Sequence, residues 1–116
     1  MSTLVTGVAG FIGMHTAKSL LSKGNHVVGI DNLNHYYDPR LKKARLTQLE
    51  SFDEFSFFKT DFATQSFVEE FTETHPQIDQ VIHLGAQAGV RNSIDKPQDY
   101  MKSNLAGQLN ILEYCR

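Results

Sequence analysis

Three glycines near the N-terminus form the pattern in this sequence that is most informative about chemistry. Gly7, Gly10 and Gly13 lie in the segment VTGVAGFIG, after a short apolar run and before an amphipathic stretch. The first glycine permits a tight turn out of a strand, the second lets backbone N–H groups approach a pyrophosphate, and the third allows close packing of the following helix. The N-terminus of that helix favours an anion. The spacing therefore predicts a phosphate-binding turn.

An acidic residue follows this turn at the position that a dinucleotide site requires. Asp31 ends the second β-rich run, close to the spacing of about 20 residues at which a carboxylate reaches the adenosine ribose. Its charge would repel the 2′-phosphate of NADP, and no arginine or lysine follows it before Arg40. The pattern predicts NAD as the cofactor. The alternative is a turn in which the glycines and the aspartate have only a structural role.

The elements that must position these residues follow from the hydrophobic pattern. Short apolar runs alternate with amphipathic stretches, which is typical of βαβ units. The expected strands cover residues 3–6, 26–30, 55–59 and a run with Val81, Ile82 and Leu84. The pattern predicts an α/β fold, the N-terminal part of a Rossmann-type doubly wound parallel sheet. It has about four strands with flanking helices, in the spatial order 3-2-1-4.

Local signals mark the ends of the first two helices. The first runs from about Phe11 to Lys23 and ends at Gly24, and the second begins with Asp38 as N-cap and Pro39 at the first helical position. The expected apolar side of the second helix consists of Leu41, Ala44 and Leu49. Its basic residues could contact a nucleotide phosphate, but we expect them to form a solvated face. These are Arg40, Lys42, Lys43 and Arg45.

Two further helices are expected in the second half of the chain. Thr64 is expected to cap a short helix that holds Phe67 and Phe71 and ends before Pro76. A last helix carries apolar residues along one face, at a spacing typical of helices. These residues are Met101, Leu105, Leu109 and Leu112.

Composition narrows the classes of protein that need to be considered. The 116 residues suit one domain over 1–116, and 41% hydrophobic with 21% charged residues is ordinary for a globular protein. A net charge of −2 disfavours a nucleic-acid partner, and no apolar run is long enough to cross a membrane. The five histidines show no metal-ligand spacing, and we expect His83 to be a hydrogen-bonded structural residue. One cysteine, Cys115, fits a reducing, cytoplasmic location.

With these residues in view, the sequence resembles the extended short-chain dehydrogenase/reductase family, in particular its nucleotide-sugar epimerases and dehydratases. The spacing T-G-x-x-G-x-x-G is theirs, and three further segments are similar to the UDP-glucuronate 4-epimerases. These segments are GIDNLNHYYD (29–38), VIHLGAQAGVRNS (81–93) and SNLAGQLNILEYCR (103–116). One departure is Gly85, where these enzymes more often have alanine. The resemblance covers essentially the whole chain and implies NAD as cofactor and a UDP-sugar as substrate.

The resemblance also implies which residues contact the ligands. Residues 11–12 would lie beside the pyrophosphate, 31–32 would hold the ribose, and 61–62 would border the adenine. Residues 84–87 would form the turn under the nicotinamide-side ribose. The expected cofactor-binding residues are Gly7, Gly10, Phe11, Ile12, Gly13, Asp31, Asn32, Asp61, Phe62, Leu84, Ala86, Gln87 and Asn104. Gln87 and Arg91 could face the sugar nucleotide.

The residues that would perform the family's chemistry do not occur in this sequence. That chemistry needs a tyrosine followed four residues later by a lysine. Tyr36 is followed by Arg40, Tyr37 by Leu41, Tyr100 by Asn104, and Tyr114 stands too near the end of the 116 residues. We therefore expect no catalytic residue here. The chain is expected to be an inactive N-terminal part of an enzyme that converts UDP-glucuronate to UDP-galacturonate through a transient 4-keto intermediate.

Other interpretations stay open at this point. The chain could be a stand-alone, non-catalytic NAD-binding sensor or interaction module, or part of a nucleotide-sugar dehydratase. A sheet that stops at its fourth strand exposes an edge of unpaired backbone groups. We therefore expect a homodimer, or self-association through that sheet edge.

Overall fold

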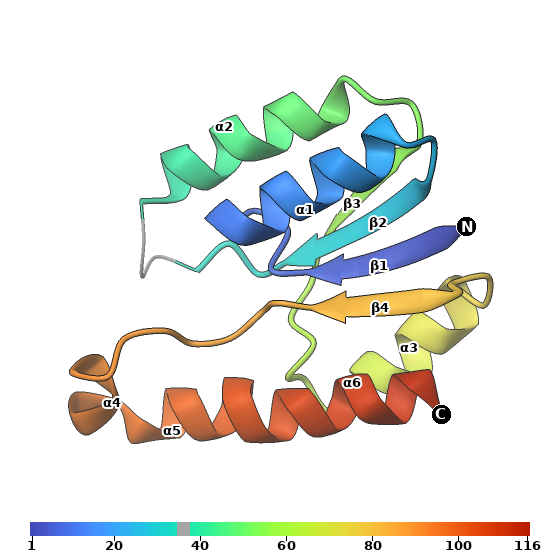
Figure 1. Ribbon diagram of the computed structural model, residues 1–116. Coiled ribbons are helices and arrows are strands. Elements are labelled where there is room, and N and C mark those ends of the chain that lie inside the picture. The colour runs from blue at the N-terminus through green and yellow to red at the C-terminus, as the bar shows by residue number, and fades with distance from the viewer. Residues whose placement is uncertain (35–37) are drawn as a thin grey trace. The chain divides into compact units, whose positions relative to one another are not determined.

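A parallel sheet of four strands in the order β3-β2-β1-β4 organises one part of the fold (Figure 1). The structure is a computed structural model that describes residues 1–34 and 38–116. All three neighbouring pairs are parallel. The strands are β1 (Ser2–Thr6), β2 (His26–Asp31), β3 (Phe55–Lys59) and β4 (Gln80–His83). The predicted fold class and strand order are confirmed, while Leu84 lies just beyond its expected strand.

The described residues divide into two compact units. The first consists of Met1–Thr60 with Gln77–Leu84, and the second of Asp61–Pro76 with Gly85–Arg116. The first unit holds the whole sheet together with helices α1 (Phe11–Ser22) and α2 (Pro39–Glu50). The second holds the remaining helices. Part of the family-like segment 29–38, namely residues 35–37, lies outside the described residues.

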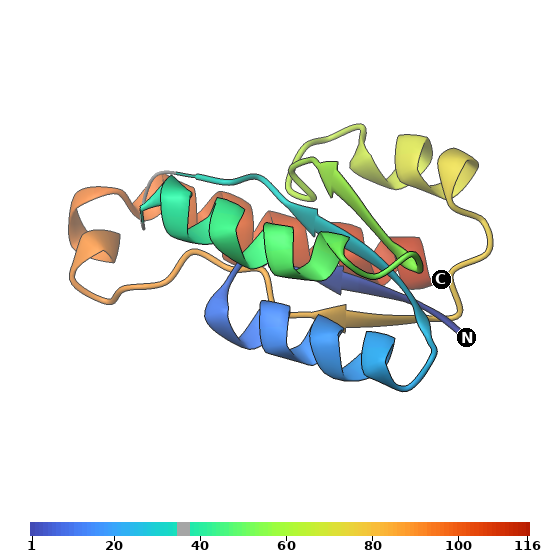
Figure 2. The same cartoon turned by 90° about the horizontal axis from the view of Figure 1, so that it is seen from above.

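Helices α1 and α2 pack side by side on the same face of the sheet, as Figures 1 and 2 show. Buried residues of α1, among them Met14, Ala17 and Leu21, join Val5 and Val27 of the strands in one core cluster. The predicted end of α1 is confirmed. Gly24 has a φ of 85°, and the N–H of Asn25 donates to the carbonyl of Leu20 at 3.1 Å, which closes the last turn.

Helix α2 begins as predicted but buries a different side. Asp38 is the N-cap, accepts from the N–H of Arg40 at 2.9 Å, and precedes Pro39. The buried residues are Lys42, Leu46 and Leu49, whereas Leu41 is 50% exposed. The expectation for Leu41 and Ala44 was therefore wrong. Positions 42, 46 and 49 share one side of a helix, and that side meets the core.

The second unit is built from short helices and contains an aromatic cluster. Phe67 and Phe71 stack with their centroids 5.1 Å apart, and Tyr114 meets Phe71 edge-on at 5.3 Å. Asn110 donates to the carbonyls of Phe62 at 2.9 Å and Thr64 at 3.0 Å. The elements are α3 (Phe67–Thr74), α4 (Asn92–Asp95), α5 (Pro97–Tyr100), the π-helix η1 (Met101–Ala106) and α6 (Gly107–Cys115). None of the helices described here is both long enough and apolar enough to cross a membrane.

One expectation for this unit needs correction. Ser66, not Thr64, is the N-cap of α3, and the Thr64 hydroxyl donates instead to the carbonyl of Asp61 at 2.9 Å. The predicted apolar face of the last helix spans η1 and α6 and is exposed, while Gly107 and Ile111 are the buried residues of α6. The exposed stripe consists of Met101 (63%), Leu105 (63%), Leu109 (58%) and Leu112 (57%).

A polar contact joins the carboxyl ends of β1 and β4. The buried Thr6 hydroxyl lies 2.6 Å from Nδ1 of His83, and the N–H of Leu84 donates to the same hydroxyl oxygen at 3.0 Å. A neutral ring whose Nδ1 accepts from Thr6 fits both bonds. Burial lowers the pKa of His83, because desolvation disfavours the charged imidazolium. The structural role expected for His83 is consistent with this contact.

The buried side of α2 can be checked by truncating one leucine on each side of the helix. Leu49→Ala should lower the free energy of unfolding by about 2–5 kcal/mol, because it leaves a cavity in the core. Leu41→Ala, on the exposed side, should change it by less than about 0.5 kcal/mol. Urea denaturation measures both values. Equal losses for the two variants would contradict the assignment of the buried side.

The stability of the chain should depend on the protonation of His83. The unfolded state takes up a proton at the ordinary pKa of 6.5, whereas the pKa of the folded state is lower. The stability that the neutral ring contributes is therefore present above pH 6.5 and is lost as the pH falls through the folded pKa. His83→Gln should flatten this decline in denaturation curves recorded across acidic pH. Burial also lowers the pKa of His75, but wild type and His83→Gln both contain this residue, so its effect is the same in the two curves. Superimposable pH profiles would refute the assignment.

Candidate nucleotide-binding site

The glycine turn is held in shape by contacts between backbone atoms. Gly7 has a φ of 68°, and its N–H donates to the carbonyl of Ile30 at 3.0 Å, which fixes the turn to β2. The N–H of Gly10 donates to the carbonyl of Gly7 at 3.0 Å. A Cβ on Gly13 would lie 2.0 Å from that same carbonyl oxygen. The third glycine therefore lets the first turn of α1 press against the backbone of the loop before it.

The N-terminus of α1 presents backbone donors without a cap from the protein. Gly10 is the N-cap, with no side-chain hydrogen bond and no acidic residue in the first turn. Phe11 and Ile12 are 65% and 66% exposed, and the N–H groups of a first helical turn have no partner within the helix. Such donors at the positive end of a helix dipole suit a phosphate group.

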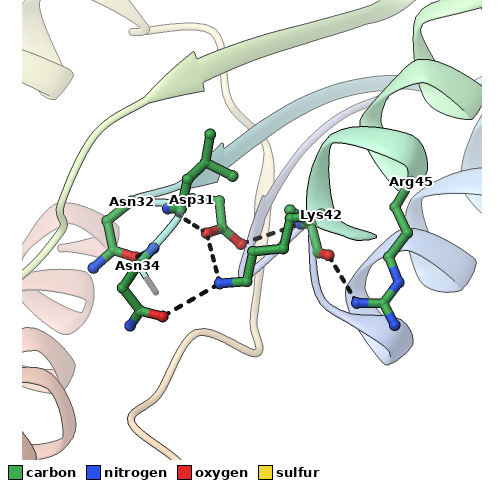
Figure 3. A network of polar contacts seen from close by, with 7 residues as sticks. Asp31, Asn32, Asn34, Lys42 and Arg45 are labelled. Atoms are coloured by element: carbon green, nitrogen blue, oxygen red, sulfur yellow. Dashed lines mark hydrogen bonds and ion pairs between the residues drawn. The ribbon is translucent and has the colours of Figure 1, made fainter. Parts of the chain in front are cut away.

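The Asp31 carboxylate lies at the carboxyl end of β2 and reaches the glycine turn (Figure 3). One oxygen, Oδ2, accepts from the N–H of Ala9 at 3.2 Å, and Oδ1 accepts from the N–H of Leu33 at 2.8 Å. Leu33 has a φ of 55°, a conformation that non-glycine residues adopt at a cost. Asp31 itself is only 8% exposed. The structure thus brings Asp31 next to the predicted phosphate-binding turn.

Two basic residues of α2 also face this region, and the sequence analysis did not identify them as site residues. Lys42 Nζ lies 3.5 Å from Asp31 Oδ1 and 3.4 Å from Asn34 Oδ1. Arg45 donates to the carbonyl of Ala9 at 3.2 Å, and its guanidinium lies 5.9 Å from the centre of the Phe11 ring. Figure 3 shows the Lys42 side chain extending from α2 toward Asp31 and Asn34, and the dashed line that marks the bond of Arg45.

The expectation of a solvated basic face on α2 is therefore half right. Arg40 and Lys43 are exposed, and Arg40 pairs with Asp38 at 2.8 Å, which lowers the pKa of that carboxyl. Lys42 is buried because it shares its side of the helix with Leu46 and Leu49. The spacing of Lys42 from Leu46 and Leu49, four and seven residues, was the signal in the sequence that Lys42 faces the core.

The other predicted positions of the first unit lie nearby but differ in their contacts. Asn32 is exposed, and its Oδ1 accepts from the N–H of Asn34 at 3.1 Å. Leu84 follows β4 and is bonded to Thr6 of the adjacent β1. Both therefore lie after the carboxyl ends of parallel strands, the edge at which ligands bind in open α/β sheets.

The predicted positions of the second unit form contacts of their own. Asn104 accepts from the N–H of Gln87 at 2.8 Å and donates to its carbonyl at 3.1 Å, so these two residues are brought together. Asp61 pairs with Lys102 at 3.7 Å. Phe62 is partly buried, and its ring would touch a Cβ on Gly107. Ala86 is exposed, and Arg91 is exposed at the start of α4.

The first unit combines three chemical functions within a short distance. The start of α1 offers N–H donors to an anion, the buried carboxylate of Asp31 offers acceptor positions, and Lys42 adds a cation. A carboxylate has about four lone-pair positions, and backbone N–H groups occupy one on each oxygen here. Capacity remains for the hydroxyl groups of a ligand. The arrangement suits a molecule with a polyphosphate beside a diol.

Solved structures of larger enzymes contain this arrangement of elements. The UDP-glucuronic acid 4-epimerase of Bacillus cereus, in complex with UDP-glucuronic acid and NAD, superposes with a TM-score of 0.86 and 37% identity. The match covers 99% of this chain and 36% of that one. The UDP-glucose 4-epimerase of Thermotoga maritima, with UDP-glucose, gives a TM-score of 0.80 and 32% identity, over 98% of this chain and 33% of that one.

Sequence comparison points to the same group of proteins. The UDP-glucuronate 4-epimerase of Thermodesulfobacterium geofontis is 46% identical over 113 residues, which are 97% of this chain and 35% of the relative. The chain thus spans about a third of the length of such relatives. The family profile described as GDP-mannose 4,6 dehydratase matches residues 4–116. The chain therefore belongs to this family of epimerases and dehydratases, within the extended short-chain dehydrogenases/reductases that its sequence resembles.

Proposed function

We propose that this chain is the NAD-binding part of a nucleotide-sugar 4-epimerase that interconverts UDP-glucuronate and UDP-galacturonate through a 4-keto intermediate. The observation that carries the proposal is the Asp31 carboxylate, which is bonded to Ala9 in the glycine turn. A carboxylate that can accept from a diol thereby stands beside a helix N-terminus that can bind a phosphate. The similarity to epimerases whose structures contain NAD and UDP-glucuronic acid supports this choice of ligands.

The residues of the first unit fit NAD by the chemistry of their donors and acceptors. The uncapped N–H groups of Phe11 and Ile12 would bind the pyrophosphate, and Asp31 would bind the adenosine ribose. Glycine at position 13 keeps the turn pressed against α1, where a Cβ would collide with Gly7. NAD bound here would supply the hydride acceptor for oxidation of the sugar, and the role of this chain would be to hold and orient the cofactor.

We propose that residues 1–116 act as a single NAD-binding domain, with further contacts from both units. Asn32 and Leu84 of the first unit would approach the two riboses. In the second unit, Asp61 and Phe62 would border the adenine, and the bonded pair Gln87 and Asn104, with Ala86, would lie near the nicotinamide-side ribose. Gln87 and Arg91 are the proposed contacts to the sugar nucleotide.

The gene distinguishes one of two other functions from this proposal. A dehydratase would use the same cofactor site, and a stand-alone NAD-binding sensor would need no catalytic residues. An open reading frame that continues into a Tyr-x-x-x-Lys segment favours an enzyme over a sensor. We also propose a cytoplasmic location, which the single cysteine supports because disulfides are rare in that compartment.

Removing the Asp31 carboxylate tests the cofactor proposal directly. Asp31→Ala should raise the dissociation constant for NAD by roughly tenfold or more, because about 1.4 kcal/mol of ribose binding corresponds to a factor of ten. Asp53→Ala, which removes an exposed acid of the same unit, is the matched control and should leave the constant unchanged. Isothermal titration calorimetry measures both. Equal affinities for wild type and Asp31→Ala would mean that Asp31 does not contact the ribose.

We further propose that the 116-residue chain associates with itself through the outer strand β4, whose far side faces no other strand of the described sheet. Light scattering at rising concentration should show a growing mean mass. Leu109→Glu changes the exposed apolar stripe of η1 and α6 but not β4, so it should leave this association intact. A monomer at all concentrations would refute self-association, and loss of association in Leu109→Glu would assign it to the stripe instead.

A further inference from the structure

The Lys42 ammonium is a cation enclosed in the proposed ribose site. Lysine side chains normally extend until the ammonium reaches water. The side chain of Lys42 is only 10% exposed, and that of its partner Asp31 is 6% exposed. Lys43, the next residue on α2, is exposed. The enclosure is therefore specific to position 42 and does not reflect the helix as a whole.

The contacts of Lys42 leave hydrogen-bonding capacity for a ligand. An ammonium has three N–H donors, and charge-assisted bonds to oxygen are about 2.7–2.9 Å long. Within the part of the chain that the structure describes, the two acceptors near Nζ are Asp31 Oδ1 at 3.5 Å and Asn34 Oδ1 at 3.4 Å. Both distances exceed those of close bonds. The ammonium is held in place electrostatically, but the described residues do not use all of its donors.

The neighbouring carboxylate is arranged in a complementary way. Asp31 receives one backbone N–H on each oxygen, from Ala9 and Leu33, and these bonds fix its orientation. A ribose offers two adjacent hydroxyl groups, each of which donates one hydrogen bond and accepts others. A carboxylate alone can use only the donating side of such a diol. A carboxylate beside an ammonium can use both.

We propose that Lys42 is a second ribose-binding residue, whose ammonium donates to a hydroxyl oxygen of the adenosine ribose while the Asp31 carboxylate accepts from the diol. This inference rests on the proposed NAD site. It assigns to α2, as well as to the end of β2, a direct part in cofactor recognition. It also makes the ribose site electrically balanced, so that affinity depends on hydrogen bonds to the diol more than on net charge.

The test compares variants with NAD analogues that lack one ribose hydroxyl. Lys42→Met removes the ammonium and keeps most of the side-chain volume, and Lys43→Met removes an exposed charge from the same helix. Calorimetry would give dissociation constants for NAD, 2′-deoxy-NAD and 3′-deoxy-NAD, with the missing hydroxyl on the adenosine ribose. We expect Lys42→Met to raise the dissociation constant for NAD at least tenfold and Lys43→Met to raise it less than twofold. For one of the deoxy analogues the effect of Lys42→Met should fall below threefold, because the hydroxyl that it binds is absent.

If Lys42→Met raises the dissociation constants for NAD and for both analogues by the same factor, the proposal is overturned, since Lys42 would then act without touching a hydroxyl. An unchanged NAD affinity would overturn it as well. If wild type fails to bind NAD, or if Asp31→Ala binds it as wild type does, the NAD site itself is refuted. If Lys42→Met does not fold, NMR of wild type with ¹³Cε-labelled lysine replaces it, with the Lys42 signal assigned through Lys42→Arg. That signal should move when NAD binds and should move less with one deoxy analogue, and a stationary signal would overturn the proposal.

Discussion

The hydrogen bonds of the Asp31 carboxylate are the constraint on which the proposed site depends. Through Ala9 they connect the end of β2 to the glycine turn and through Leu33 they shape the loop that follows, while an ion pair with Lys42 connects the same carboxylate to α2. The glycine turn is distant along the chain from both the loop and α2. A single buried acid thus sets where the turn, the loop and the helix meet, and the conformation of Leu33 at positive φ is kept because that meeting point requires it.

The glycine turn receives support from both of its sides. The N–H of Ala9 is bonded to Asp31 and its carbonyl to Arg45, so the peptide groups around this residue are held from β2 and from α2. The backbone N–H groups at the start of α1 therefore follow a turn whose position is fixed by these bonds. The second unit shows the same principle, since Gln87 and Asn104 bind each other through two hydrogen bonds and the Tyr100 hydroxyl donates to the carbonyls of Ala88 and Gly89. Backbone groups of loops that lack regular structure are satisfied by side chains in both units.

Local signals predicted the parts of this fold that local interactions determine. The turn at Gly7, the helix end at Gly24 and the cap at Asp38 were all foreseen, because each is specified by residues within one turn of the chain. The strand order followed from the regular alternation of elements. The burial of Lys42 was missed because its partner Asp31 lies on another element, and a lysine is assigned to solvent unless such a partner is known. Thr64 is a different case, because its hydroxyl donates to the carbonyl of Asp61, three residues earlier, so that a local alternative competed with the expected helix cap.

The backbone contact at Gly13 has a consequence for how this sequence can change over evolutionary time. At Gly29 an added Cβ would meet the side chains of Val8 and Phe55, so a smaller neighbour could accommodate it through a second substitution. At Gly13 the added atom would meet the carbonyl of Gly7, a group that every residue type carries. No exchange of a neighbouring side chain removes that obstacle. Drift at position 29 can thus proceed through compensated pairs, whereas position 13 has no compensating partner and changes only if the path of the main chain changes with it.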